Sequence, residues 1–273
     1  MLDLHCHLLP AVDDGAVDLD MALEMARMAV ADGIEVVACT PHIYPGLYEN
    51  TRPLIEQAVA ELRRELDARG IELELVVGAD VHLTPDLPSA IRSGRVPTLG
   101  GSRYLLLEPP HHTAPPRFED SLFELMAAGY TPVLTHPERL SWVEEHYAMF
   151  ARLSERGVWM QVTAGALTGR FGRRVQYWGE RFVDEGHCMV LATDAHHPVR
   201  RPPLLAEAVE AAARRVGSDE ARHMVFSRPR GILENADPHS LPSAVGSANG
   251  QMQPAPEDTG IGRAFLRRLR GKA

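Results

Sequence analysis

Short apolar runs alternate with amphipathic segments along most of the chain. The apolar runs predict strands at 1–5, 34–39, 73–78, 104–107, 132–135, 158–162 and 189–192. Between them, apolar residues recur at helical spacing and predict helices at 19–30, 52–69, 118–128, 142–156, 172–185, 204–216 and 220–226. Asp18 is the expected N-cap of the first helix, which ends at Gly33. This strand–helix repeat is typical of a parallel barrel or of a doubly wound sheet.

Polar residues stand at corresponding places, where the predicted strands end. They are His5 and His7 at the first strand, His42 at the second, Asp80 at the third, Glu108 at the fourth, His136 at the fifth, and Asp194 with His196 at the seventh. In a closed barrel, all these strand ends open onto one mouth. In an open sheet they would be spread along a line, and groups from the two edges could not meet. The positions therefore favour a closed α/β barrel of about seven strands.

These residue types are those that hold divalent metal ions. In His5-Cys6-His7, strand alternation places both imidazoles on one face and Cys6 on the other. Asp14 lies in the Asp-Asp-Gly turn that follows. Each could be an ordinary buried polar group, and Glu108 could instead pair with Arg139 or Arg117. Imidazoles and carboxylates together suit a transition metal, and bound cations relieve the repulsion among clustered carboxylates, so the set predicts a polynuclear metal site.

Composition narrows the classes of protein. The chain carries 37 acidic and 28 basic residues, which argues against a general nucleic-acid binder. Its three cysteines, Cys6, Cys39 and Cys188, do not form a disulfide pattern and are expected to be reduced core thiols. No signal-peptide pattern and no run long enough to span a bilayer is present. These features fit a cytoplasmic enzyme of bacterial type.

The character of the chain changes near its C-terminus. Residues 240–262 are rich in Ser, Pro, Gly, Asn and Gln, so a domain over 1–236 followed by a disordered polar linker is expected. The last segment, 263–273, is basic and weakly amphipathic. It is expected to be a solvated tail, with docking to an acidic partner or to an anionic membrane surface as the alternative.

The motifs, taken in order, resemble the polymerase and histidinol phosphatase (PHP) superfamily. Within it they are most similar to the manganese-dependent tyrosine phosphatases of bacterial capsule and exopolysaccharide operons. The matching segments are 3–7 (DLHCH), 12–15 (VDDG), 40–42 (TPH), 78–80 (GAD), 84–86 (TPD), 96–98 (VPT), 102–104 (SRY), 136–139 (HPER) and 201–203 (RPP). The resemblance covers residues 1 to about 235 and implies a distorted TIM-like (β/α)7 PHP barrel.

The resemblance also implies three divalent metal ions, manganese before iron, cobalt or zinc. The first would be held by His5, His7, Asp80 and Asp194, the second by Asp80, Glu108 and His136, and the third by Asp14, His42 and His196. The family usually has Glu where this chain has Asp80. In this ligand set Asp80 would bridge the first and second metals. Because Asp is shorter by one methylene, we expect this bridge to be tighter or one of the two metals to be held more weakly.

The expected reaction is hydrolysis of a phosphomonoester by a metal-activated hydroxide. Arg139 would clamp the phosphate through its planar fork, and Arg201 matches a family arginine near the pocket. No cysteine is followed by an arginine at the spacing that a cysteine phosphatase needs. His82, His111, His112 and His197 are expected to be exposed loop histidines, with support of the metal ligands or contact with the substrate as the alternative.

The expected substrate is a phosphotyrosine protein, the tail of a bacterial tyrosine autokinase that controls polysaccharide export; this target follows only from the resemblance. A small-molecule phosphatase such as histidinol phosphatase is the first alternative. An exonuclease-type PHP domain is disfavoured by the acidic charge. A non-catalytic regulator that binds a kinase would have no need of nine metal-compatible side chains. The early helices and the segment 44–48 could also form a homo-oligomer interface.

Overall fold

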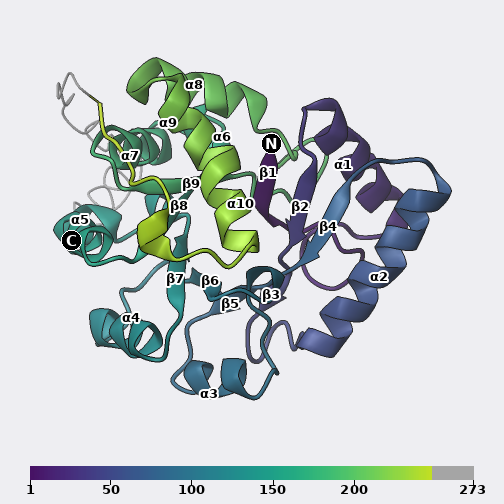
Figure 1. Cartoon of the computed structure of the whole chain (residues 1–273), viewed down its shortest axis with the longest axis horizontal. Helices are drawn as coiled ribbons and strands as arrows, with labels where there is room; N and C mark the ends of the chain where they lie inside the picture. The colour runs from purple at the N-terminus through teal and green to yellow at the C-terminus, as the bar shows by residue number, and fades with distance from the viewer. Residues whose placement is uncertain (248–273) are drawn as a thin grey trace, which may run out of the picture.

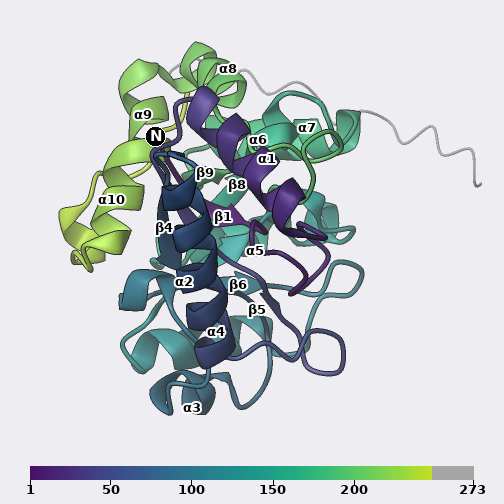
Figure 2. The ribbon, with the colours of Figure 1, turned by 90° about the vertical axis from the view of Figure 1, so that its right-hand side faces the viewer.

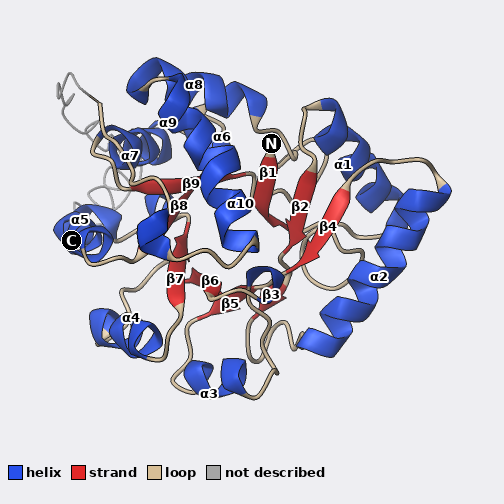
Figure 3. Ribbon diagram, in the orientation of Figure 1, coloured by secondary structure: helices blue, strands red, loops and turns tan. Residues whose placement is uncertain are grey.

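The computed structural model describes residues 1–247. Nine strands, all paired in parallel, are ringed by helices (Figures 1 and 3). The strands are β1 Leu2–Cys6, β2 Val36–Cys39, β3 His42–Ile43, β4 Glu74–Val77, β5 Asp80–His82, β6 Tyr104–Glu108, β7 Thr131–Thr135, β8 Trp159–Thr163 and β9 Cys188–Ala192. The helices are α1 Leu19–Ala31, α2 Arg52–Ala68, α3 Leu87–Arg92, α4 Phe118–Ala127, α5 Val143–Glu155, α6 Ala164–Leu167, α7 Arg173–Asp184, α8 Ala206–Val216, α9 Ser218–Arg222 and α10 Arg228–Leu233.

The strands form two sheets that continue into one another. Their orders are β1-β2-β4 and β3-β5-β6-β7-β8-β9. Only Thr40 and Pro41 separate β2 from β3, and only Gly78 and Ala79 separate β4 from β5. Backbone bonds bridge this gap, from Gly78 N to the Cys39 carbonyl at 3.0 Å and from Asp80 N to the Pro41 carbonyl at 3.1 Å. Each pair of short strands is therefore one bent strand, which gives the seven strands that the sequence predicts.

The two ends of this array meet next to the strand ends. Cys6 forms a parallel bridge with Ala195, just after β9. Asp194 N donates to the His5 carbonyl at 2.7 Å, and His7 N donates to the Ala195 carbonyl at 2.9 Å. The fold is thus the TIM-like α/β barrel that the sequence predicts, joined here by these bonds at its carboxyl end. The bend was not predicted, because Pro41 and the short polar run of β5 hide the two strand continuations.

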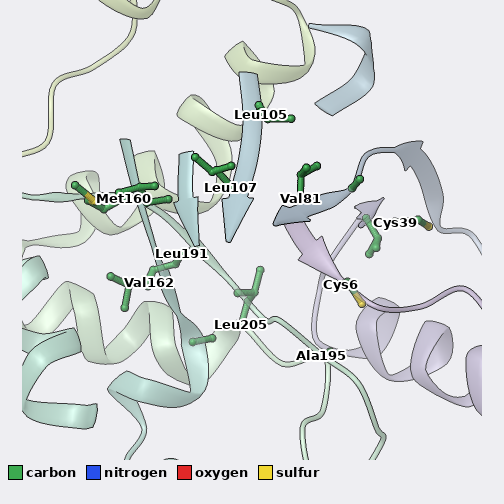
Figure 4. Close-up of a cluster of buried hydrophobic side chains, with 14 of the residues drawn as sticks. Cys6, Cys39, Val81, Leu105, Leu107, Met160, Val162, Leu191, Ala195 and Leu205 are labelled. Atoms are coloured by element: carbon green, nitrogen blue, oxygen red, sulfur yellow. The ribbon is translucent and has the colours of Figure 1, made fainter. Parts of the chain in front are cut away.

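Alternation along each strand separates an outer from an inner core. Outward residues such as Leu107, Val162 and Leu191 pack against the helices, together with Cys6 and Cys39 (Figure 4). Inward residues such as Leu106 and Val133 fill the barrel at the end where the strands begin. Further along the same inward faces the residues become polar, so the mouth of the barrel holds the charged groups.

The three cysteines are free and buried, which confirms the prediction of core thiols. Asp18 caps α1, its side chain accepting from Met21 N at 2.9 Å.

The helix predicted at 220–226 is instead α9 followed by a π-helical turn, His223–Ser227. The helices α3, α6 and α10 were not predicted; all three are short. Within residues 1–247, no helix has the length and apolar character needed to cross a bilayer.

The helix α10 and the segment that follows it cover the end of the barrel where the strands begin (Figures 1 and 2). The Tyr104 hydroxyl, at the start of β6, donates to the Ala236 carbonyl at 3.0 Å, and Leu241 packs against the inner core. Ser247 N donates to the Asp184 carbonyl at 2.7 Å. The packed domain therefore reaches at least Ser247, and the stretch 237–247, expected to be disordered, is held by the barrel. The remainder of the expected linker and the basic tail lie outside the described residues.

Candidate metal centre

All nine predicted metal ligands converge at the mouth of the barrel. Their ligand atoms fall into five overlapping groups, within each of which all ligand atoms lie within 4.8 Å of one another. The groups are His7–Asp14–His42–His196, His5–His7–Asp80, His5–His136–Asp194, Glu108–His111–His136 and His42–Asp80–Glu108. Two donors of one ion, each about 2.1 Å from it, are at most about 4.2 Å apart, so these groups are close to the size of metal sites.

The group around Asp14 contains the third ligand set implied by the sequence. Asp14 Oδ1 lies 3.5 Å from His42 Nε2 and 3.4 Å from His196 Nε2. The His7 ring packs on the His196 ring with centroids 3.7 Å apart. His7 was assigned elsewhere from the resemblance, and here it also reaches this group.

The centre of the cluster is formed by two fully buried groups, His5 and Asp80. His5 Nε2 lies 3.5 Å from Asp80 Oδ2, 3.4 Å from Asp194 Oδ1 and 3.2 Å from His7 Nε2. Neither oxygen of Asp80 accepts a hydrogen bond within residues 1–247. Its close neighbours are two imidazoles, because His42 Nδ1 lies 3.3 Å and His5 Nε2 3.5 Å from Oδ2. A buried carboxylate set among imidazoles, with its oxygens free of hydrogen bonds, suits a metal ligand.

His111 joins Glu108 and His136, although the sequence predicts an exposed loop histidine. Its Nε2 lies 3.1 Å from Glu108 Oε1, whereas His136 Nε2 lies 3.7 Å from the same oxygen. The loop is fixed, because Ser141 N donates to the His111 carbonyl at 2.9 Å and Trp142 Nε1 donates to the Pro110 carbonyl at 2.8 Å. Asp80 and His136 do not share one of these groups, whereas His111 shares one with Glu108 and His136.

Two imidazoles of the cluster carry a raised pKa. Burial lowers the pKa of His5, but the Asp194 and Asp80 carboxylates outweigh burial and raise it to about 9. Burial also lowers the pKa of His42, and Asp80 outweighs it and raises the pKa to about 10. The carboxylates thus attract positive charge, which protons supply here and which a divalent ion would supply when it replaced those protons.

Two other imidazoles have a lowered pKa. Burial, followed by the charge of Arg139, holds the pKa of His136 well below its usual range. Burial and the neighbouring His7 lower the pKa of His196 to about 4. The neutral imidazole is the form that binds a metal, so these two side chains are already in that form at neutral pH. The donor types, their spacing and the buried carboxylate of Asp80 among imidazoles together fit divalent transition ions.

Residues behind the cluster hold its ligands in place. Asp13 Oδ2 pairs with His7 Nδ1 at 2.7 Å and accepts from His42 N at 3.0 Å. Gln161 Oε1 lies 2.9 Å from His5 Nδ1. Such bonds fix the orientation and tautomer of a ligand. These supporting roles were not predicted from the sequence. The signals for them were that Gln161 is a polar residue on a predicted strand and that Asp13 stands beside the predicted ligand Asp14.

The loop that carries Asp13 and Asp14 lies directly against β1. A Cβ atom on Gly15 would stand 2.2 Å from the His7 carbonyl oxygen and 2.5 Å from His7 Cβ. Two ligands also have a left-handed backbone, His136 with φ 37° and Asp194 with φ 51°. Such conformations cost energy for residues with a side chain and are concentrated at functional sites.

Both predicted arginines border the cluster through one carboxylate. Arg139 Nη1 and Arg201 Nη2 donate to Asp194 Oδ2. The guanidinium of Arg139 also lies over the Phe171 ring, 5.1 Å from its centroid. Desolvation raises the pKa of Asp194, but Arg201, His5 and Arg139 outweigh it and hold this pKa well below its usual range. Two cationic forks therefore stand at the edge of the centre, where a phosphate bound there would meet them.

A parallel α/β barrel with imidazoles and carboxylates at its mouth defines the class of metal-dependent barrel hydrolases. A dihydropyrimidinase from Brevibacillus agri shares this fold at 11% identity, with a TM-score of 0.51 over 90% of this chain and 73% of that chain. The family model for capsular polysaccharide synthesis, CpsB/CapC, matches residues 1–234. The chain belongs to this family, which confirms the resemblance drawn from its motifs.

Individual relatives match over nearly the whole domain. The tyrosine-protein phosphatase YwqE of Bacillus subtilis is 32% identical over 235 residues, covering 86% of this chain and 92% of the relative. The tyrosine-protein phosphatase CpsB of Streptococcus agalactiae is 25% identical over 244 residues, covering 86% and 99%. A crystal structure from work on YwqE of Bacillus subtilis and CpsB of Streptococcus pneumoniae, described as metal-dependent tyrosine phosphatases, aligns with a TM-score of 0.83 and 31% identity, over 90% of this chain and 99% of that one.

Proposed function

We propose that this protein is a metal-dependent phosphatase that hydrolyses phosphotyrosine on a protein. The observation that carries the proposal is the convergence of all nine predicted ligands, together with two arginines, at one barrel mouth. The relatives named above as tyrosine phosphatases support the choice of phosphotyrosine among phosphate esters. The proposed setting is the cytoplasm, with a bacterial tyrosine kinase as substrate, in keeping with the family's link to capsule synthesis.

Three divalent ions, manganese first, are the proposed cofactors. Bound ions supply a hydroxide nucleophile at neutral pH and stabilise charge on the phosphate. We assign Asp14, His42 and His196 to one ion, with His7 beside it, and His5, His7, Asp80 and Asp194 to another. The remaining ion is assigned to Glu108, His111 and His136. Asp80 is not among its ligands, although Asp80 and Glu108 share a neighbouring group with His42.

Arg139 and Arg201 bind the phosphate in this proposal. Planar guanidinium groups donate paired hydrogen bonds to phosphate oxygens, and Asp194 holds both groups at the mouth. Phe171 supports Arg139 from its other side. A phenolate with a pKa of about 10 leaves readily, so the reaction makes little demand for a strong general acid. Arg139→Ala should therefore raise KM and lower kcat/KM for phosphotyrosine while the metal content stays unchanged.

The substrate class is tested by phosphate release from two substrates side by side. Protein stripped of metal and reconstituted with manganese is given a phosphotyrosine peptide or histidinol phosphate. We expect strong preference for the peptide and no activity without metal. Preference for histidinol phosphate would keep the site but make the protein a small-molecule phosphatase. Activity on neither substrate would favour a non-catalytic, kinase-binding regulator.

The role of His111 is tested by metal content rather than by activity. Elemental mass spectrometry of the purified, manganese-loaded protein should find three manganese ions per chain. His111→Ala should lose one ion, or bind it more weakly by at least the roughly 10- to 100-fold that is typical when a residue that merely supports a ligand is removed. His112→Ala, an exposed neighbour, is the matched control and should keep the full content. Full content and affinity in His111→Ala would remove His111 from the ligand set.

A further inference from the structure

A cavity of about 310 Å³ opens beside the metal centre. It lies on the outer side of β3 and β5, between the start of α2 and helix α3. Its floor is apolar and is formed by Ile43, Val81, Leu87, Ala90 and Val96. Its rim is polar and includes Glu49, Asn50, Thr84, Asp86 and Arg95. None of these side chains belongs to the predicted ligand set.

The cavity and the metal centre are formed by neighbouring residues of the same strands. His82 lines the cavity, and in the strand ladder it is paired with the ligand Glu108. The His82 ring stacks on Tyr44 with centroids 4.0 Å apart and planes 7° apart. Asn50, on the rim, donates through Nδ2 to the carbonyl of the ligand His42 at 2.9 Å. The cavity is therefore built on residues next to the ligands His42, Asp80 and Glu108.

The charges of the rim indicate what the cavity takes. Asp86 is already paired with Arg95. Glu49 accepts from Gly46 N at 2.6 Å and has no basic partner within residues 1–247. One carboxylate is therefore left over above an apolar floor. Lysine and arginine match this combination, because their long stems pack on apolar surface while their charged ends stay at the polar edge.

We propose that this cavity is a specificity subsite that binds a lysine or arginine side chain close to the phosphotyrosine of the protein substrate. The proposal rests on the proposed phosphatase function and adds to it a sequence preference. Glu49 pairs with the cation, and Leu87 and Ala90 pack against the aliphatic stem. Tyr44 and Leu47 lie in the same 43–50 segment, and their side chains, 37% and 62% exposed, are accessible to a peptide.

The first test varies the substrate alone. Phosphotyrosine peptides carry lysine, norleucine, alanine or glutamate at one position at a time, from three residues before the phosphotyrosine to three after it. At one position or at two adjacent ones, we expect kcat/KM for lysine to exceed that for alanine about five- to tenfold, since a surface ion pair and a partly buried stem each contribute modestly. Norleucine, which keeps the stem without the charge, should fall between them. Equal rates at every position would overturn the proposal.

The second test varies the protein. Glu49→Gln should abolish the advantage of lysine over norleucine. Ala90→Phe should fill the floor of the cavity and so abolish the advantages of both lysine and norleucine over alanine. Both variants should hydrolyse p-nitrophenyl phosphate, which is too small to reach the cavity, within twofold of the unaltered protein. Glu24→Gln removes an exposed carboxylate on α1 and is the matched control.

The two tests separate the subsite from the phosphatase activity. A lysine preference that survives in both Glu49→Gln and Ala90→Phe overturns the subsite alone. Loss of p-nitrophenyl phosphate hydrolysis in Ala90→Phe would show a damaged fold, and the milder Ala90→Leu then carries the test. An unaltered, manganese-loaded protein that hydrolyses neither phosphotyrosine nor p-nitrophenyl phosphate refutes the proposed function, and the subsite with it.

Discussion

The two ends of the barrel both bury charge, but they treat it differently. At the closed end, where the strands begin, Arg228 is 0% exposed. It donates to both Glu220 oxygens at 2.8 and 2.9 Å, and to the carbonyls of Pro242 at 2.7 Å, Ser243 at 2.8 Å and Met189 at 3.2 Å. At the mouth, Asp80 is equally buried, and within residues 1–247 it meets two imidazoles, His42 Nδ1 at 3.3 Å and His5 Nε2 at 3.5 Å, without accepting a hydrogen bond.

This difference separates a structural ion pair from a functional cluster. Arg228 needs nothing further, because its donors meet oxygen atoms of the protein. The mouth gathers carboxylates and imidazoles whose charges are balanced in part by protons on His5 and His42, which metal cations can replace. Charge that the protein leaves unsatisfied, rather than burial itself, marks the end of the barrel where chemistry takes place. This agrees with the placement of active sites at the carboxyl end of parallel barrels.

The largest expected effect is at the mouth. Asp194→Ala removes a ligand and the carboxylate that holds both arginines, so kcat/KM for phosphotyrosine should fall at least about 1,000-fold, because metal ions contribute several kcal/mol to such reactions. Steady-state kinetics at saturating manganese, with circular dichroism to confirm folding, measures the loss. Asp20→Ala, on the exposed start of α1, is the control and should keep full activity. Full activity in Asp194→Ala would contradict the assigned site.

The next effect is at the closed end and concerns stability alone. Arg228→Ala leaves Glu220 buried without a partner and frees the segment at Pro242, so the free energy of unfolding should fall by about 3–5 kcal/mol. Urea denaturation measures this loss. Arg230→Ala, on the exposed side of the same helix, should cost less than about 1 kcal/mol. The folded Arg228→Ala protein should keep its kcat. A large loss of kcat in the folded protein would show that the two ends of the barrel are not independent.

A smaller effect is expected behind the ligands. Asp13→Asn keeps the size of the side chain but removes the carboxylate that orients His7 and His42. Affinity for manganese should fall about 10- to 100-fold, as for other residues that support ligands. Competitive metal titration measures the change, with Asp20→Asn as the control. Unchanged affinity would mean that backbone geometry alone positions the two imidazoles.

The sequence predicted the barrel from local periodicity, and it predicted the gathering of metal-compatible side chains from their places at the strand ends. His5 and His7 alternate at a strand end, and Asp194 and His196 do so after the last strand, so two-residue spacing already places each pair. The bond from Arg228 to Ser243 and the reach of His111 to Glu108 depend on how a loop or segment folds back, which periodicity does not encode. The strand β3 was missed because a two-residue strand after Pro41 carries almost no pattern.

The tight contact between Gly15 and His7 determines where the centre can be redesigned. Because no side chain fits at Gly15, the turn and β1 must be kept together in any variant intended to favour another metal. Asp13 is equally fixed by its bonds to two ligands. Asp14 lies between them with its side chain 51% exposed and without such a role. It is therefore the one position of the turn where the choice of donor atom can be altered while the scaffold that presents it stays unchanged.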